Sequence, residues 1–144
     1  MDKIAIVRIR GVRNIKPKLR KTMELLGVAR PNHCVVVDAS PQTLGMVALV
    51  KDYVTFGKVS EETLFLLLSK RGEKGSNPLS SLMKESELKA AAKEIADGKK
   101  VRDFADLVFR LKPPRRGLKD TKKAYPVGEL GKRDEMDSLI RRMV

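Results

Sequence analysis

The sequence contains few of the residues on which metal proteins and disulfide-bonded proteins depend. Its 144 residues include one cysteine, one histidine and no tryptophan. Cys34 cannot form an internal disulfide, and with only His33 beside it there is no set of ligands for a metal ion. The longest apolar run, residues 63–68, is far shorter than the roughly 20 residues that span a bilayer. The chain also opens on a charged strand instead of a signal peptide, which predicts a cytoplasmic location.

Recognisable catalytic arrangements are missing as well. There is no Walker loop, dinucleotide-binding fingerprint or zinc-ligand spacing, and residues 72–75 (GEKG) form only a turn-like string. His33 has no serine or aspartate placed to make a triad with it. Cys34 lies in an apolar run, which favours a buried strand residue over a nucleophile. We therefore expect no catalytic residue, no cofactor and no small-molecule substrate.

Positive charge is abundant, and it is concentrated in two segments. The formal net charge is +13. Residues 1–40 carry nine Lys/Arg and three Asp/Glu, a net of +6, and residues 111–133 carry eight and two, again +6. Between them, residues 41–110 carry twelve basic and ten acidic residues, a net of +2. Two basic segments that flank a nearly neutral body indicate a polyanion-binding protein, because each phosphate that is neutralised releases counterions.

Within the first basic segment, residues 8–21 carry seven cations in fourteen positions and no acid. They fall on the end of a predicted strand, a loop and one helical turn, so they can converge at one end of a sheet. Such cations repel one another unless phosphate lies between them. We therefore predict RNA contacts at Arg8, Arg10, Arg13, Lys16, Lys18, Arg20 and Lys21.

The second basic segment has no hydrophobic period and is interrupted by proline and glycine. Such a stretch cannot build its own core, so it is either a disordered tail or an extension that becomes ordered against RNA. We favour the extension, because residues 125–127 (YPV) and the amphipathic helix after them indicate that the chain returns to the body. Its predicted RNA contacts are Lys112, Arg115, Arg116, Lys119, Lys122, Lys123, Lys132 and Arg133.

Periodicity and end signals predict three strands and five helices. The strands are expected at residues 4–10, 33–38 and 107–111. Helices are expected from Pro17 to Gly27, from Pro41 to about Gly57, over 61–71, over 86–96 and over 136–143. The predicted organisation is one compact domain: residues 1–58 plus 101–112 form the core fold, residues 59–100 a helical insert, and residues 113–144 a basic extension with a C-terminal helix.

The pattern favours folded RNA over DNA. No helix has a basic face long enough to fill a major groove, and no DNA-binding motif is present. The six Phe and Tyr residues lie mostly on apolar stripes, which leaves no stacking platform for single strands. The remaining mode of binding is recognition of the shape and phosphates of folded RNA by loops and extensions.

Four segments resemble one ribosomal protein family. They are residues 4–11 (IAIVRIRG), 18–27 (KLRKTMELLG), 33–41 (HCVVVDASP) and 44–47 (LGMV). In order and spacing they are similar to the large-subunit protein called protein thirty in bacteria and protein seven in eukaryotes. The likeness covers residues 3–57, and the insert with residues 111–117 (LKPPRRG) and 128–133 (GELGKR) resembles the longer archaeal and eukaryotic members. The long basic N-terminal extension of eukaryotic members is missing, which indicates the archaeal form.

The resemblance implies an α+β fold, with a small three-stranded sheet in a βαβαβ core related to ferredoxin-like folds and helices on one face. It implies a non-catalytic structural constituent of the large (50S) ribosomal subunit that binds and stabilises rRNA. The family's contact regions correspond here to Arg8, Arg10, Arg13, Lys18, Arg20 and Lys21, and the archaeal extension to Arg115, Arg116 and Lys119. Expected partners are large-subunit rRNA, 5S rRNA and neighbouring ribosomal proteins, with no membrane and no obligate homo-oligomer.

Two alternatives stay open at this point. One is a free-standing RNA- or DNA-binding architectural protein. The other is a small RNA-modifying enzyme, which would need Asp, Ser, Cys or His side chains clustered in one pocket.

Overall fold

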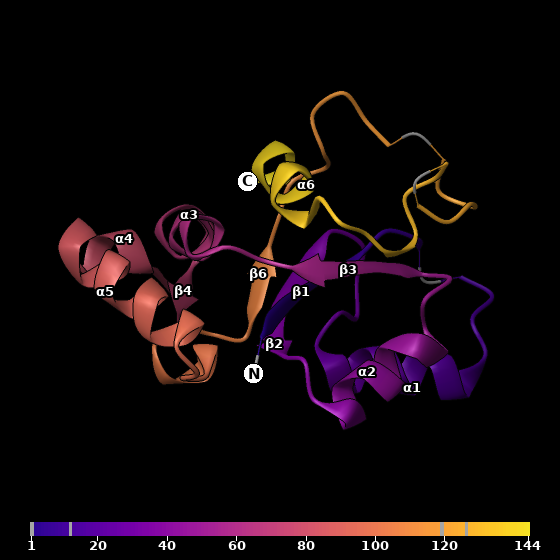
Figure 1. Ribbon diagram of the computed structural model, residues 1–144, viewed down its shortest axis with the longest axis horizontal. Coiled ribbons are helices and arrows are strands. Elements are labelled where there is room, and N and C mark those ends of the chain that lie inside the picture. Colours follow the sequence, from indigo (N-terminus) through magenta and orange to yellow (C-terminus); the bar gives the residue numbers. More distant parts are fainter. Residues whose placement is uncertain (1, 12, 119, 126) are drawn as a thin grey trace.

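The computed structural model describes residues 2–11, 13–118, 120–125 and 127–144, and its centre is a mixed five-stranded sheet (Figure 1). The strand order is β6-β2-β1-β3-β7. The central strand, β1, runs antiparallel to β2 and β3; β6 is antiparallel to β2, whereas β7 is parallel to β3. The strands are β1 Lys3–Arg8, β2 His33–Asp38, β3 Val54–Lys58, β6 Val108–Arg110 and β7 Gly131–Lys132.

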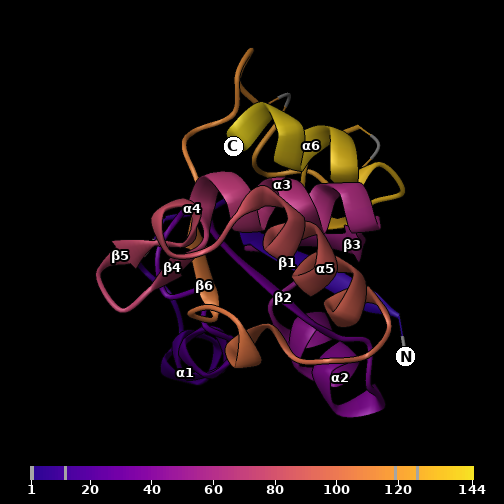
Figure 2. The same ribbon diagram turned by 90° about the vertical axis from the view of Figure 1, so that its left-hand side faces the viewer.

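All six residues of β1 are buried, because helices cover both faces of the sheet. Side chains alternate along a strand, so Ile4 and Ile6 enter one core cluster while Ala5 and Val7 enter the other. Figure 2 shows α1 and α2 below the sheet and α3 and α6 above it, while α5 shares the core cluster of Ala5 and Val7 with α3 and α6. The helices are α1 Pro17–Leu26, α2 Pro41–Leu49, α3 Glu61–Arg71, α4 Leu79–Leu82, α5 Glu85–Ala96 and α6 Met136–Met143, with a 3₁₀ turn at Val101–Asp103.

The first helix begins and ends at its predicted signals, and the second begins at its predicted start. Pro17 occupies the first turn of α1, where its missing N–H costs nothing, and Gly27 ends the helix with a φ of 92°. The Ser40 side chain caps α2 by accepting from the N–H of Thr43. Both helices pack on the same face of the sheet, as the resemblance implied.

The insert covers the opposite face and shares its core with β1 and β2. Leu64, Leu67 and Leu68 of α3 lie in one apolar cluster with Ile95 of α5 and Met136 of α6. Between α3 and α4, Glu73–Lys74 (β4) and Asn77–Pro78 (β5) pair as a short hairpin. The helices are therefore not confined to one face: the insert and α6 complete a second layer. No helix within the described ranges is both long enough and apolar enough to cross a bilayer.

The second helix was predicted to continue to about Gly57, and that prediction is wrong. The helix ends at Leu49, and residues 54–58 form β3, which pairs with β1. Met46, Val50 and Tyr53 have the spacing of an apolar helical stripe, and this spacing continues through the turn that joins α2 to β3. The β-branched and aromatic residues of β3 were the competing signal. The core sheet thus contains β3 as well as the predicted β6.

The extension returns to the sheet through β7. Arg133 donates its N–H to the carbonyl of Phe56 at 2.9 Å, and the Thr55 hydroxyl donates to the carbonyl of Gly131 at 3.0 Å. Gly57 permits this approach: a Cβ there would stand 2.5 Å from the carbonyl oxygen of Arg133. At β7 the chain therefore lies against the body, as the predicted extension requires.

Candidate nucleic-acid interface

Strand directions bring several loops to one end of the sheet. Because β1 is antiparallel to both neighbours, its last residue lies beside the first residues of β2 and β3: Arg8 pairs with Val54 and Val7 with Cys34. Arg110, the last residue of β6, pairs with His33. The loops at residues 9–11 with 13–16, 29–32, 50–53 and 111–118 therefore lie at the same end, which we call the basic end. The chain leaves β1 and enters β3 toward the right of Figure 1, where the extension also lies.

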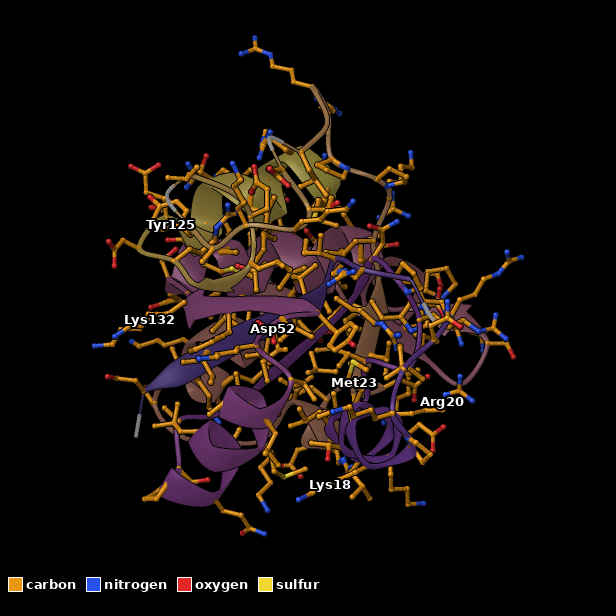
Figure 3. All side chains as sticks on the ribbon, turned by 90° about the vertical axis from the view of Figure 1, so that its right-hand side faces the viewer. Lys18, Arg20, Met23, Asp52, Tyr125 and Lys132 are labelled. Atoms are coloured by element: carbon orange, nitrogen blue, oxygen red, sulfur yellow. The ribbon has the colours of Figure 1, made fainter. Side chains whose placement is uncertain are left out.

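Most of the predicted contact residues are exposed. Figure 3, which looks toward this side, places Lys18 and Arg20 on α1 at one margin and Tyr125 and Lys132 across from them. Arg10 is half-buried, with its guanidinium carbon 5.3 Å from the centre of the Tyr53 ring. Those exposed are Arg13, Lys16, Lys18, Arg20, Lys21, Lys112, Arg115, Arg116, Lys122, Lys123 and Lys132. Lys119 lies outside the described residues.

Arg8 departs from the prediction that it contacts phosphate. Only 1% of the residue is exposed, and its side chain donates to backbone carbonyls. The acceptors are the carbonyl oxygens of Arg10 at 3.0 Å, Gly11 at 3.0 Å, Val28 at 3.2 Å and Ala29 at 2.8 Å. Burial, and to a smaller extent the charge of Arg20, lowers the pKa of Arg8. This cation lies inside the protein because the surrounding loops turn their carbonyls toward it.

Arg133 also departs from its predicted role. It is 6% exposed, and its guanidinium forms a buried ion pair with Glu129. The same group lies 5.1 Å from the centre of the Tyr125 ring, and its Nε is buried without a hydrogen-bond partner. Arg133 therefore fastens the extension to the body, and it does not point outward as the neighbouring Lys132 does.

Three exposed cations at the basic end were not predicted from the sequence. Arg30 lies in the loop before β2, Lys51 in the loop before β3, and Arg110 at the end of β6. Arg110 also pairs with Glu73 of the hairpin at 3.3 Å. Their positions in the sequence are ordinary, and only the strand order brings them together. A correct assignment of β3 would have indicated Lys51.

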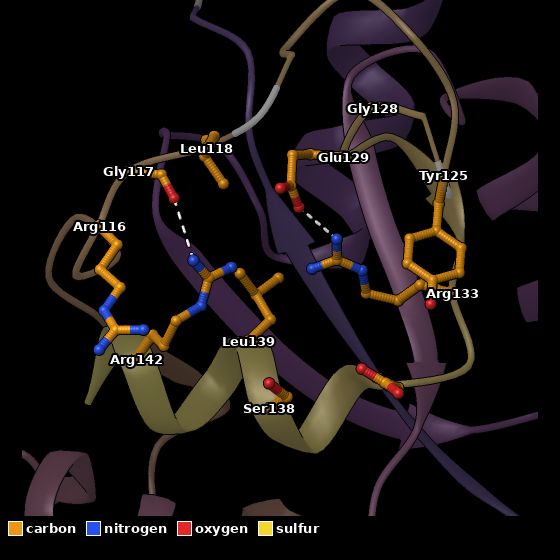
Figure 4. A pocket seen from close by; sticks show the side chains of 11 residues that line it. Arg116, Gly117, Leu118, Tyr125, Gly128, Glu129, Arg133, Ser138, Leu139 and Arg142 are labelled. Atoms are coloured by element: carbon orange, nitrogen blue, oxygen red, sulfur yellow. Dashed lines mark hydrogen bonds and ion pairs between the residues drawn. The ribbon is translucent and has the colours of Figure 1, made fainter.

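A cleft of about 430 Å³ separates the extension from α6 (Figure 4). Arg142 reaches across it from α6 and donates to the carbonyls of Arg115 at 3.3 Å and Gly117 at 3.1 Å. Arg116 and Tyr125 line other parts of the same cleft. Arg142 and Arg133 thus hold the extension in place, which leaves Arg115 and Arg116 as its exposed arginines here.

His33 and Cys34 differ in their exposure although they are adjacent. Burial and the charges of Arg110, Arg30 and Arg8 lower the pKa of His33, so its ring is neutral at neutral pH. Complete burial in β2 raises the pKa of the Cys34 thiol to about 12. The prediction of a buried strand cysteine is confirmed, and a thiol with this pKa is a poor nucleophile.

Fold and charge together define a class: a small α+β protein that gathers exposed cations at one end of its sheet, as polyanion-binding proteins do. Residues 4–54, which run from β1 to the start of β3, match the family model for ribosomal protein L30p/L7e. Similarity to curated proteins extends over nearly the whole chain.

The large ribosomal subunit protein uL30 of Archaeoglobus fulgidus is 39% identical over 149 aligned positions, which cover 96% of this chain and 98% of the relative. The protein of the same name from Methanocella arvoryzae is 38% identical over 150 positions, with the same two coverages. That from Methanothrix thermoacetophila is 36% identical over 148 positions, again with 96% and 98% covered. The chain belongs to the L30p/L7e family of ribosomal proteins, and its resemblance to the archaeal form is confirmed.

Proposed function

We propose that this protein is a structural constituent of the large ribosomal subunit and that it binds folded rRNA through the basic end. The observation that carries the proposal is the convergence of cations. Exposed Lys and Arg side chains from two segments that lie about a hundred residues apart in the sequence occupy one end of a single sheet. Curated relatives named as large-subunit proteins, similar over nearly their full length, support the same role.

The finer features of the proposal follow from the same surface. Exposed Arg13, Lys16 and Arg20 contact phosphate from the loop and helix after β1, while Arg115 and Arg116 contact it from the extension. Large-subunit rRNA is the main partner, with 5S rRNA and neighbouring ribosomal proteins as further ones. The protein acts in the cytoplasm, as one subunit of the assembly, without catalysis. The insert of residues 59–100 contributes a structural layer to the single domain.

Sedimentation of a cell extract tests the ribosomal assignment. The full-length protein is expected to run with the large subunit on sucrose gradients and to stay with it through washes of increasing salt. A protein found mainly in a free pool, running as a small monomer or dimer, would contradict the assignment. That result would favour the free-standing RNA- or DNA-binding protein.

Charge variants test the surface itself. Replacing Arg13 and Arg20 together by alanine is expected to flatten the dependence of log K on log salt for rRNA binding by about two units. The matched control replaces Lys93 and Lys100, two exposed lysines of the insert, and removes the same charge. This control should leave the slope unchanged. Equal changes in both variants would mean that net charge, and not the basic end, governs binding.

A further inference from the structure

Arg8 connects two loops of the basic end through its side chain. The Nε donates to Arg10 and one terminal nitrogen to Gly11, both in the loop after β1. The other terminal nitrogen donates to Val28 and Ala29, in the loop before β2. A buried guanidinium is usually paired with a carboxylate. Among the described residues no salt bridge joins Arg8 to an acid, so carbonyl oxygens alone receive its hydrogen bonds.

The backbone of Arg8 extends this connection to the second basic segment. Its carbonyl accepts the N–H of Asn32 at 2.8 Å, and the carbonyl of Asn32 accepts the N–H of Leu111 at 3.1 Å. Asn32 adopts a left-handed φ of 64°, which turns its N–H and carbonyl toward these two partners. Lys112 follows directly. One buried residue therefore links the loop after β1, the loop before β2 and the start of the extension.

We propose that Arg8 is a positioning residue for RNA binding: it holds the loops that carry Arg13 and Arg30 in one arrangement before RNA arrives. The inference rests on the proposed function. Loops that are already ordered lose less conformational entropy on binding, which strengthens affinity without any additional contact. All four side-chain acceptors lie in loops, whereas β1 is held by its own backbone pairing with β2 and β3. Loss of the side chain therefore loosens the basic end more than the sheet.

Arg8→Lys separates positioning from charge. Lysine keeps the positive charge but presents a single ammonium group. It lacks the planar fork of nitrogens by which the guanidinium reaches acceptors on both loops. If the charge of Arg8 attracts RNA, the lysine variant binds like the unchanged protein. If Arg8 positions the loops, binding to deproteinised large-subunit rRNA weakens about tenfold.

The salt slope provides the second readout. Arg8→Lys is expected to leave the slope of log K against log salt unchanged, because no phosphate contact is lost. Arg13→Gln, a matched loss of an exposed cation, should lower the slope by about one unit. In the free variant, hydrogen exchange should speed up at the amides of residues 10–11, 29–30 and 32 while the amides of β1 and β2 keep their protection. Unchanged affinity, or a slope lowered by one unit, would overturn the proposal.

A second pair of variants tests the same connection without altering Arg8, in case Arg8→Lys does not fold. Asn32→Ala strains the left-handed backbone that links Arg8 to Leu111, whereas Asn32→Gly tolerates it. The alanine variant should bind the same rRNA more weakly than the glycine variant, at an equal salt slope. Equal affinities would count against positioning. Failure of the unchanged protein to bind this rRNA would instead reject the proposed function.

Discussion

The two basic segments carry equal net charge, yet the fold holds them in different ways. The first continues from the central strand into α1, whose Met23 and Leu26 are buried in the core. The second is attached by a few separate contacts. The backbone N–H groups of Lys112 and Arg115 donate to the carbonyls of Met143 at 2.9 Å and Arg142 at 3.0 Å, and Glu129 forms a buried ion pair with Arg133. Formation of the core therefore determines where the first segment lies, whereas the second depends on a few local attachments.

This difference means that the two halves of the proposed interface can be disturbed separately. Apolar burial stabilises the first half, and a change there affects the whole domain. The second half is fixed by the ion pair of Glu129 with Arg133 and by the close approach of the Arg133 carbonyl to Gly57. Changes at these attachments should alter the extension while the loop after β1 keeps its arrangement.

The largest effect is expected from the buried ion pair. Glu129→Ala leaves Arg133 buried without its carboxylate, and an uncompensated buried charge costs about 3–5 kcal/mol of unfolding free energy. Urea unfolding measures this loss. Replacing both partners, by Glu129→Gln with Arg133→Met, should recover most of it, because no charge is then left buried. An equal loss in the single and double variants would show that packing, and not charge, holds the extension.

A smaller effect is expected at Gly57. Any side chain there meets the carbonyl of Arg133, and overpacking of this kind costs about 1–3 kcal/mol. Gly57→Ala should therefore push β7 away from β3, which limited proteolysis of the extension would detect as faster cleavage between residues 112 and 133. Gly45→Ala, where a Cβ meets nothing within 4 Å, is the matched control. Cleavage that is no faster than in this control would mean that β7 adjusts to the added methyl group.

Helix caps and apolar stripes in the sequence predicted those helices whose ends and buried faces depend on neighbouring residues. The Ser60 side chain caps α3, which was predicted over 61–71, by accepting from the N–H of Thr63, and the apolar stripe of Met136, Leu139 and Ile140 is buried in α6. The family resemblance supplied the α+β class. The end of α2 was misplaced, because its apolar stripe continues through the turn to β3 in the same helical spacing.

The candidate site was predictable in part, for a related reason. An exposed cation such as Arg13 and a buried one such as Arg8 look alike in a basic stretch. Their difference depends on carbonyls from residues 28 and 29, which the fold brings to Arg8 across about twenty positions of sequence. Likewise, Arg30 and Lys51 can be assigned to the basic end only when the order of the strands in the sheet is known. Charge in the sequence predicts that a surface is basic, whereas tertiary structure decides which cations reach it.

The smallest effect concerns His33, which reports on crowding of charge near the first segment. Its pKa is lowered from the ordinary value of 6.5 in the folded protein, so the unfolded chain takes up a proton first as the pH falls. Stability should therefore decrease on acidification through and below pH 6.5, and His33→Gln should remove this contribution. Urea unfolding of both proteins at several pH values measures the difference. NMR titration of the imidazole should show that Arg110→Gln raises the pKa, whereas Lys132→Gln in the second segment does not. A pKa equally sensitive to both changes would mean that the two segments form one electrostatic unit despite their different attachments.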